Sequence, residues 1–68
     1  MLHIAAVATL TLALYNTEQD MTNDTPVVSQ SYYSSQEECN TQRTTMIPQL
    51  DEKLANGLLA YSITCETK

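Results

Sequence analysis

The fourteen residues from Leu2 to Tyr15, LHIAAVATLTLALY, are the most apolar segment of the chain and limit its possible folds more than any other feature. Every second residue from Ile4 to Leu14 is apolar, and a period of two is typical of a β-strand. The residues between them are small or weakly polar, so both faces of such a strand tolerate burial, as at the centre of a sheet. The run is shorter than the roughly 20 residues of a transmembrane helix. We therefore predict a central strand over residues 2–15.

A secretory signal peptide is the competing interpretation of this segment, because its apolar length also suits a signal core. Three features oppose it: no Lys or Arg precedes the run, Thr9 and Thr11 interrupt it, and no small-x-small cleavage site follows Leu14. We favour a retained strand, which implies a cytoplasmic protein. The alternative is an exported protein from which residues 1–15 are removed.

The next two segments differ sharply in composition. Residues 16–26, NTEQDMTNDTP, are polar and rich in turn formers, which predicts a loop. Residues 27–33, VVSQSYY, are rich in Val and Tyr and contain no charge, which predicts a second strand. The alternation of polar and apolar residues is poor in this strand, and this favours a position at the edge of the sheet.

A helix is expected to begin immediately after this second strand. Ser34 and Glu37, and equally Ser35 and Glu38, have the three-residue spacing of a capping box, in which a serine side chain satisfies a free N–H group of the first turn. Acidic residues also suit the positive end of the helix dipole. The sequence leaves open which of the two serines is the cap.

An apolar stripe at helical spacing follows the cap. Pro48 interrupts it, since proline lacks the backbone N–H and crowds the preceding turn; because the stripe keeps its phase, we favour a kinked helix over two separate ones. Asn56 and Gly57 are typical of a left-handed helix end, and LLAYSITC, residues 58–65, predicts the third strand. The stripe comprises Cys39, Arg43, Met46, Ile47, Leu50 and Leu54.

These elements predict a single small α+β domain over residues 1–68, with the order strand, strand, helix, strand. The first connection suits an antiparallel hairpin. Placing the apolar first strand in the middle gives a three-stranded antiparallel sheet of spatial order 2-1-3, with the helix packed on one face.

The same arrangement brings the two cysteines of the chain together. From Cys39 to Ala55 the helix rises roughly 24 Å at about 1.5 Å per residue. From Leu58 to Cys65 the third strand returns roughly 23 Å at about 3.3 Å per residue. Cys65 should therefore lie level with Cys39, and both fall on core-facing stripes. We expect a disulfide in an oxidising compartment and two buried thiols in a reducing one.

Composition excludes several classes of function. The formal charge of −5 and the scattered basic residues, Arg43, Lys53 and Lys68, argue against binding to nucleic acid or to an anionic membrane. His3 is the only histidine, and no spacing in the chain indicates a catalytic group, a metal site or a cofactor. We therefore predict a protein that is not an enzyme and has no bound cofactor.

The remaining prediction is association with other proteins. A sheet covered on one side leaves its second face and its edges open, and such surfaces favour contacts between chains. We expect a small interaction or accessory module of the kind found in phages and microbes, most simply a homo-oligomer, although the acidity is also compatible with a larger partner that has a basic surface. A thiol-redox role for the cysteines ranks behind this module and the exported domain. The predicted self-association face comprises Ala5, Val7, Thr9, Thr11 and Ala13.

Overall fold

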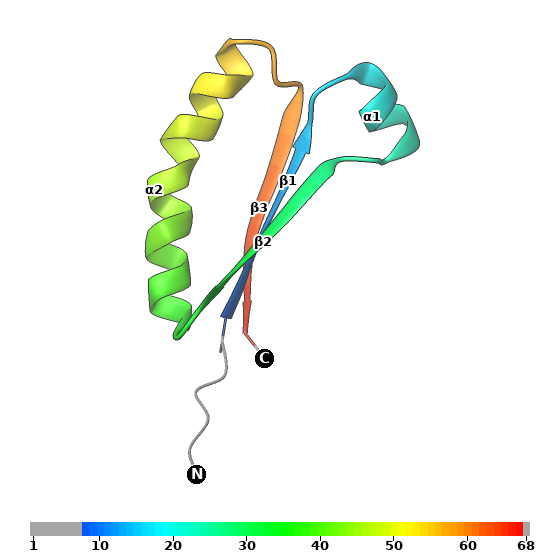
Figure 1. Ribbon diagram of the computed structural model, residues 1–68. Coiled ribbons are helices and arrows are strands. Elements are labelled where there is room, and N and C mark those ends of the chain that lie inside the picture. Colours follow the sequence, from blue (N-terminus) through cyan, green and yellow to red (C-terminus); the bar gives the residue numbers. More distant parts are fainter. Residues whose placement is uncertain (1–7, 68) are drawn as a thin grey trace.

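The computed structural model describes residues 8–67 and contains one three-stranded sheet, one long helix and one short helix (Figure 1). The strands lie in the order β2-β1-β3, and β1 is antiparallel to both of its neighbours. The predicted α+β fold with the first strand in the centre is therefore confirmed. In chain order the elements are β1 (Ala8–Tyr15), α1 (Glu18–Asn23), β2 (Val27–Tyr33), α2 (Gln36–Ala55) and β3 (Ala60–Thr67).

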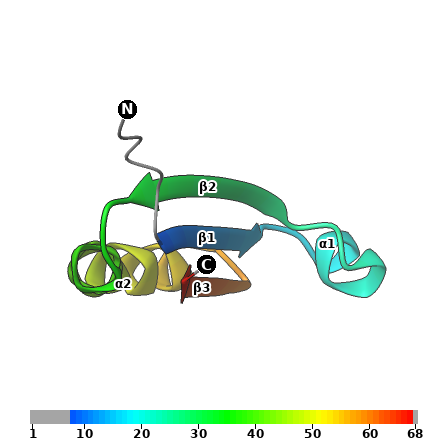
Figure 2. The same cartoon turned by 90° about the horizontal axis from the view of Figure 1, so that it is seen from below.

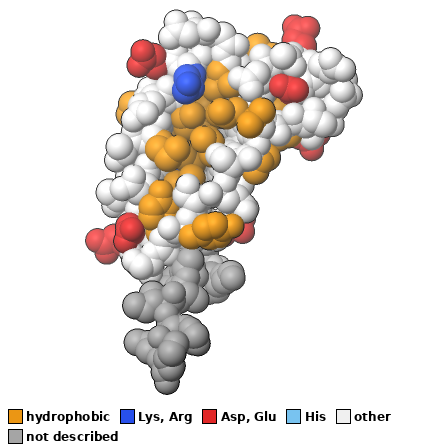
Figure 3. Space-filling view, viewed as in Figure 1, with side chains coloured by type: hydrophobic (Ala, Val, Ile, Leu, Met, Phe, Trp, Pro, Cys, Tyr) orange, Lys and Arg blue, Asp and Glu red, His pale blue; other side chains and the backbone are white. Residues whose placement is uncertain are grey.

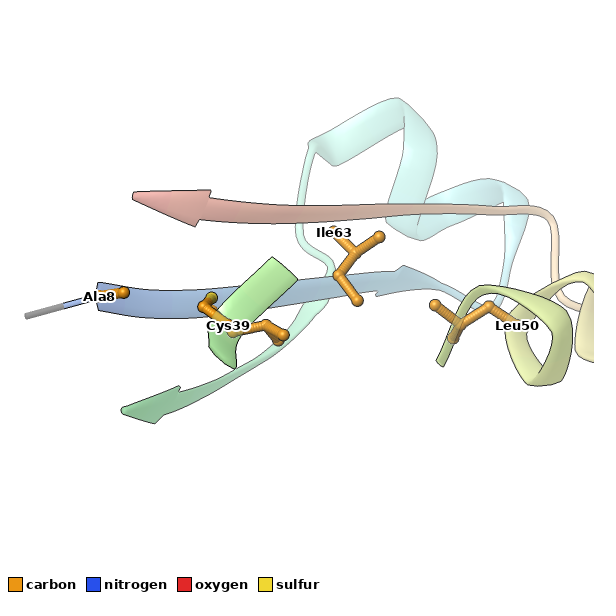
Figure 4. Close-up of a cluster of buried hydrophobic side chains, with 5 residues drawn as sticks. Ala8, Cys39, Leu50 and Ile63 are labelled. Atoms are coloured by element: carbon orange, nitrogen blue, oxygen red, sulfur yellow. The ribbon is translucent and has the colours of Figure 1, made fainter. Parts of the chain in front are cut away.

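β1 supplies the middle of the core. Its even-numbered residues face α2, and Ala8 and Leu10 are only 1% and 2% exposed. In the sheet, Leu10 lies opposite Ser31 of β2 and Cys65 of β3. The predicted strand is thus observed from Ala8 onward, while residues 2–7 of the prediction lie outside the described part of the chain. Figure 4 shows side chains from β1, α2 and β3 meeting in this cluster, which contains Ala8, Leu10, Cys39, Leu50 and Ile63.

The start of α2 resolves the choice between the two serines. Ser35 is the N-cap, with extended backbone, and its Oγ accepts a hydrogen bond from the Glu38 N–H at 3.1 Å. The preceding Ser34 donates its hydroxyl to the Glu38 carboxylate at 2.9 Å. Of the two predicted boxes, the second therefore forms the cap, and Ser34 holds its acidic residue.

α2 runs without a break from Gln36 to Ala55, with Pro48 inside it, so the prediction of a single helix is confirmed. The helix ends in a Schellman motif: Gly57 has a φ of 122°, its N–H bonds the Leu54 carbonyl at 3.5 Å, and the Leu58 N–H bonds the Lys53 carbonyl at 2.9 Å.

β3 begins and ends two residues later than predicted: the predicted range was 58–65, and the strand spans Ala60–Thr67. Leu58 and Leu59 belong to the connection, where the Leu59 N–H bonds the Tyr15 carbonyl at 2.9 Å. At the other end the strand continues to Thr67, because Glu66 and Thr67 pair with Thr9 and Ala8. Pairing with β1, and not hydrophobicity, therefore sets the limits of β3.

The segment 16–26, predicted as a loop throughout, contains the short helix α1. Thr17 caps it, accepting a hydrogen bond from the Asp20 N–H at 3.1 Å, and Asp24 ends it in the left-handed conformation. The prediction missed this helix because none of its residues is buried and no apolar stripe reveals it. Thr17 with Asp20 has the spacing of a cap, which was the one available signal.

α2 does not cover the sheet evenly. Figure 2 shows it beside β1 and β3, with β2 at the far edge of the sheet. Six of the seven residues of β2 are exposed, whereas every residue of β1 is buried or half-buried. The sheet therefore has one edge close to the helix and one edge away from it.

Candidate functional site

Cys39 and Cys65 meet as predicted. Their sulfur atoms are at bonding distance and their Cα atoms are 6.1 Å apart, within the usual range for a disulfide. Cys39 is fully buried and Cys65 is half-buried. The bridge ties the first turns of α2 to the carboxyl-terminal half of β3.

Arg43 covers part of the outer edge of β3. Its Nε donates to the Ile63 carbonyl at 2.9 Å in a partly buried hydrogen bond. The Tyr15 carbonyl bonds on the β3 side of β1, so by strict alternation Ile63 directs its backbone groups away from β1, toward that outer edge. Sequence reasoning placed Arg43 only on the helical stripe and missed this contact. A cation within an apolar stripe, four residues after a core cysteine, was the available signal.

The outer edge of β2 has no comparable cover among the described residues. By the same alternation, the backbone groups of Val28, Gln30 and Tyr32 point away from β1. Val28 and Tyr32 are 56% and 62% exposed, and the strand carries no charged side chain. Natural edges usually carry charge, proline or a covering element, so β2 is the exposed edge most open to pairing.

Hydrophobic side chains from both α2 and the strands lie beside this edge, on the helix side of the sheet. Figure 3 shows hydrophobic side chains gathered along the molecule between α2 and the strands. Partly buried residues that pack against the core include Leu12, Leu14, Tyr33 and Met46. The offset of α2 thus leaves part of the core's flank at the surface next to β2.

The predicted self-association face lies on the opposite side of the sheet. Thr9, Thr11 and Ala13 are half-buried in the middle of it, while Ala5 and Val7 lie outside the described residues. The flanking strands make this face more polar than β1 alone indicates. Their residues opposite these three positions are Tyr32, Gln30 and Val28 on β2 and Glu66, Thr64 and Ser62 on β3.

The acidic side chains within residues 8–67 form local contacts and no metal-binding cluster. These residues contain no group of three or more His, Cys, Asp or Glu that could hold a metal ion. Carboxylates of the first connection are used locally, since Asp20 accepts from the Asn16 N–H at 3.2 Å and Asp24 from the Tyr15 hydroxyl at 2.8 Å. His3 lies outside this range. The hollow of about 610 Å³ along α2 is lined by that helix alone, which makes it a surface feature.

None of the helices in the described residues combines the length and apolar character needed to cross a bilayer.

Two tyrosines are held by aspartates. The Tyr61 hydroxyl donates to Asp51 Oδ1 at 2.8 Å, and Tyr15 donates to Asp24 in the same way. These hydrogen bonds, with smaller contributions from desolvation and from the carboxylate charge, raise the pKa of both tyrosines above 10.0; near Tyr61, Arg43 opposes the shift. The Tyr61 pair joins β3 to α2, and the Tyr15 pair joins β1 to the end of α1.

We expect the Asp51→Ala variant to lower the pKa of Tyr61, because the neutral phenol loses its acceptor and the phenolate loses a repelling charge. The pair stabilises the fold below the unfolded tyrosine pKa, near 10, and this contribution is lost as the pH rises through the higher folded value. NMR titration of the Tyr61 ring measures the change. The neighbouring Glu52→Ala variant removes the same charge from α2 and should leave the pKa in place; equal shifts in both variants would contradict the assignment.

Comparison with family models, with curated proteins and with solved structures finds no match for this chain.

Proposed function

We propose that this chain is a small non-enzymatic interaction module that binds other protein chains through the outer edge of β2. The observation that carries the proposal is the exposure of Val28 and Tyr32 on an uncharged strand, in which the backbone groups of these two residues and of Gln30 point away from β1. An extended segment that adds to such an edge gains backbone hydrogen bonds, and its alternate side chains supply specificity.

The difference between the two edges of the sheet supports binding at β2 and not at β3. Arg43 and the Cys39–Cys65 bridge hold α2 against β3, whereas β2 has six exposed residues and only Tyr33 is half-buried. The disulfide-bridged half serves as the support, and β2 serves as the contact.

Two other functions from the sequence are less well supported. Thiol exchange requires an accessible sulfur and a reactive thiolate, and the complete burial of Cys39 opposes attack there. Export with removal of residues 1–15 would delete Ala8 and Leu10 from the core and remove β1, the strand to which both others pair. The cleaved chain would therefore need a different fold.

Affinity capture from the native source tests the proposal. The bait is the full chain, compared with Gln30→Lys, which places a charge in the middle of the β2 edge, and Gln42→Lys, which places the same charge on an exposed position of α2. We expect specific binding of protein, either this chain or another, to the parent and to Gln42→Lys, with at least a tenfold loss for Gln30→Lys. Equal recovery on all three baits would contradict a role for β2.

A further inference from the structure

We propose that β2 pairs with β2 of a second copy, antiparallel and about a two-fold axis at Gln30, so that two three-stranded sheets become one continuous sheet. This inference rests on the proposed function and names the partner of the same edge. Its first support is that a strand with outward backbone groups at Val28, Gln30 and Tyr32 is symmetric about Gln30. In that register each of these residues forms a hydrogen-bonded pair with its counterpart and exchanges two backbone bonds.

The side chains of β2 are also complementary to themselves in this register. Val28 lies opposite Tyr32 of the second copy on the open face, and Val27 lies opposite Tyr33 of that copy on the helix face. Pairs of an aromatic and a β-branched residue are among the favourable cross-strand pairs, as are paired serine hydroxyls, which here are Ser29 and Ser31. A slip of one residue would place side chains on the wrong faces.

The fold leaves room for this contact. An axis perpendicular to the sheet keeps both copies of α2 on one face, and each α2 is displaced from β2 toward β1 and β3 (Figure 2). The second copy would bring its Val27 and Tyr33 beside the hydrophobic side chains that lie between α2 and the strands (Figure 3). Val27 is 59% exposed in the single chain, so pairing removes apolar surface as well as satisfying the backbone.

The effect of salt distinguishes pairing with a second copy from binding to a partner with a basic surface, which the composition also allows. Each copy carries a formal charge of −5, so two copies repel at long range although the paired strands are neutral. Added salt screens that repulsion and should strengthen self-pairing. Binding to a basic surface would weaken with salt instead.

Sedimentation equilibrium of the purified full chain tests the proposal. Because the shared edge is only seven residues long, we expect a weak dimer of the transient class. Gln30→Lys places two like charges opposite each other on the axis and should raise the dissociation constant at least tenfold, while Gln42→Lys, which lowers the net negative charge equally, should not raise it. A mass that stays monomeric up to about 1 mM, the weak end of measurable affinity, would overturn the inference.

Mixing charge variants tests the register and guards against a variant that merely misfolds. Gln30→Lys and Gln30→Glu should each dimerise poorly alone, and an equimolar mixture should recover the affinity of the parent, because opposite charges then meet on the axis. The rescue should be largest in the register that pairs position 30 with itself, because the two charges are then directly opposite. Failure to recover with both variants folded would overturn the two-fold at Gln30.

Isotope-filtered NMR gives a direct readout on the unmodified chain. In a mixture of labelled and unlabelled protein, we expect an intermolecular contact between the Val28 methyls and the Tyr32 ring. Within one strand these residues are about 13 Å apart, beyond the reach of such a signal. A dimer without this contact would contradict the register. If the chain is monomeric yet a different protein still binds the parent and not Gln30→Lys, the self-pairing fails and the proposed function stands.

Discussion

Replacing Cys39 and Cys65 together by alanine should lower the free energy of unfolding by about 3 to 4 kcal/mol. The bridge closes a loop of 26 residues in sequence separation, and the chain-entropy model assigns about that much to its effect on the unfolded state. A domain of this length is expected to have a total stability of only about 3 to 10 kcal/mol. The variant should therefore be partly or largely unfolded at physiological temperature.

Denaturant unfolding monitored by circular dichroism measures this loss. Reduced parent protein is the matched comparison, because it lacks the bond but keeps both sulfurs in place. We expect the reduced parent and the double alanine variant to agree within about 1 to 2 kcal/mol, the remainder being the cavity left at Cys39. Equal stability of the oxidised and reduced parent would contradict a stabilising role for the bridge.

Leu10→Ala should cost about 2 to 5 kcal/mol, the range for removing a buried leucine side chain. Leu10 is 2% exposed in the central strand and belongs to the cluster that includes Cys39 and Ile63. With neither Phe nor Trp in the sequence, few large side chains are available to fill the space. Collapse around the vacancy is also restricted, because β1 is paired on both sides.

Thermal or denaturant unfolding measures the effect, and Leu54→Ala is its matched control. Leu54 lies on α2 and is 38% exposed, so the same substitution should cost less than about 1 kcal/mol there. Comparable losses in the two variants would mean that Leu10 is not at the centre of the core.

Local rules in the sequence were sufficient for much of the fold. Alternation from Ile4 to Leu14 indicated the central strand, and the two overlapping capping boxes that begin at Ser34 and Ser35 placed the start of α2 to within one residue. The prediction that Cys39 and Cys65 lie at the same height in the fold followed from the rise per residue of a helix and a strand. Each of these depends on geometry that is the same in every protein.

What the sequence did not reveal depends on contacts between elements. The limits of β3 follow from pairing with β1, and the cover of its edge depends on how Arg43 reaches the Ile63 carbonyl. The helix α1 is stabilised by its own caps and has no buried residue, so no apolar pattern marks it.

The candidate site was only partly predictable for the same reason. The absence of charge in VVSQSYY and its place at an edge were read from the sequence. Which of the two edges stays open depends on the sideways position of α2, which tertiary packing determines. The sequence also directed attention to Thr9, Thr11 and Ala13 of β1, before their neighbours on β2 and β3 were known.

Hydrogen exchange by NMR tests most directly whether residues 8–15 form the permanent centre of the sheet. Every backbone N–H from Leu10 to Leu14 should exchange slowly and without gaps, because alternate residues bond to β2 and β3. In dilute protein the outward N–H groups of Val28, Gln30 and Tyr32 should exchange much faster than those of Ser29 and Ser31. Rapid exchange throughout residues 8–15 in folded protein would contradict a central β1 and the arrangement built on it.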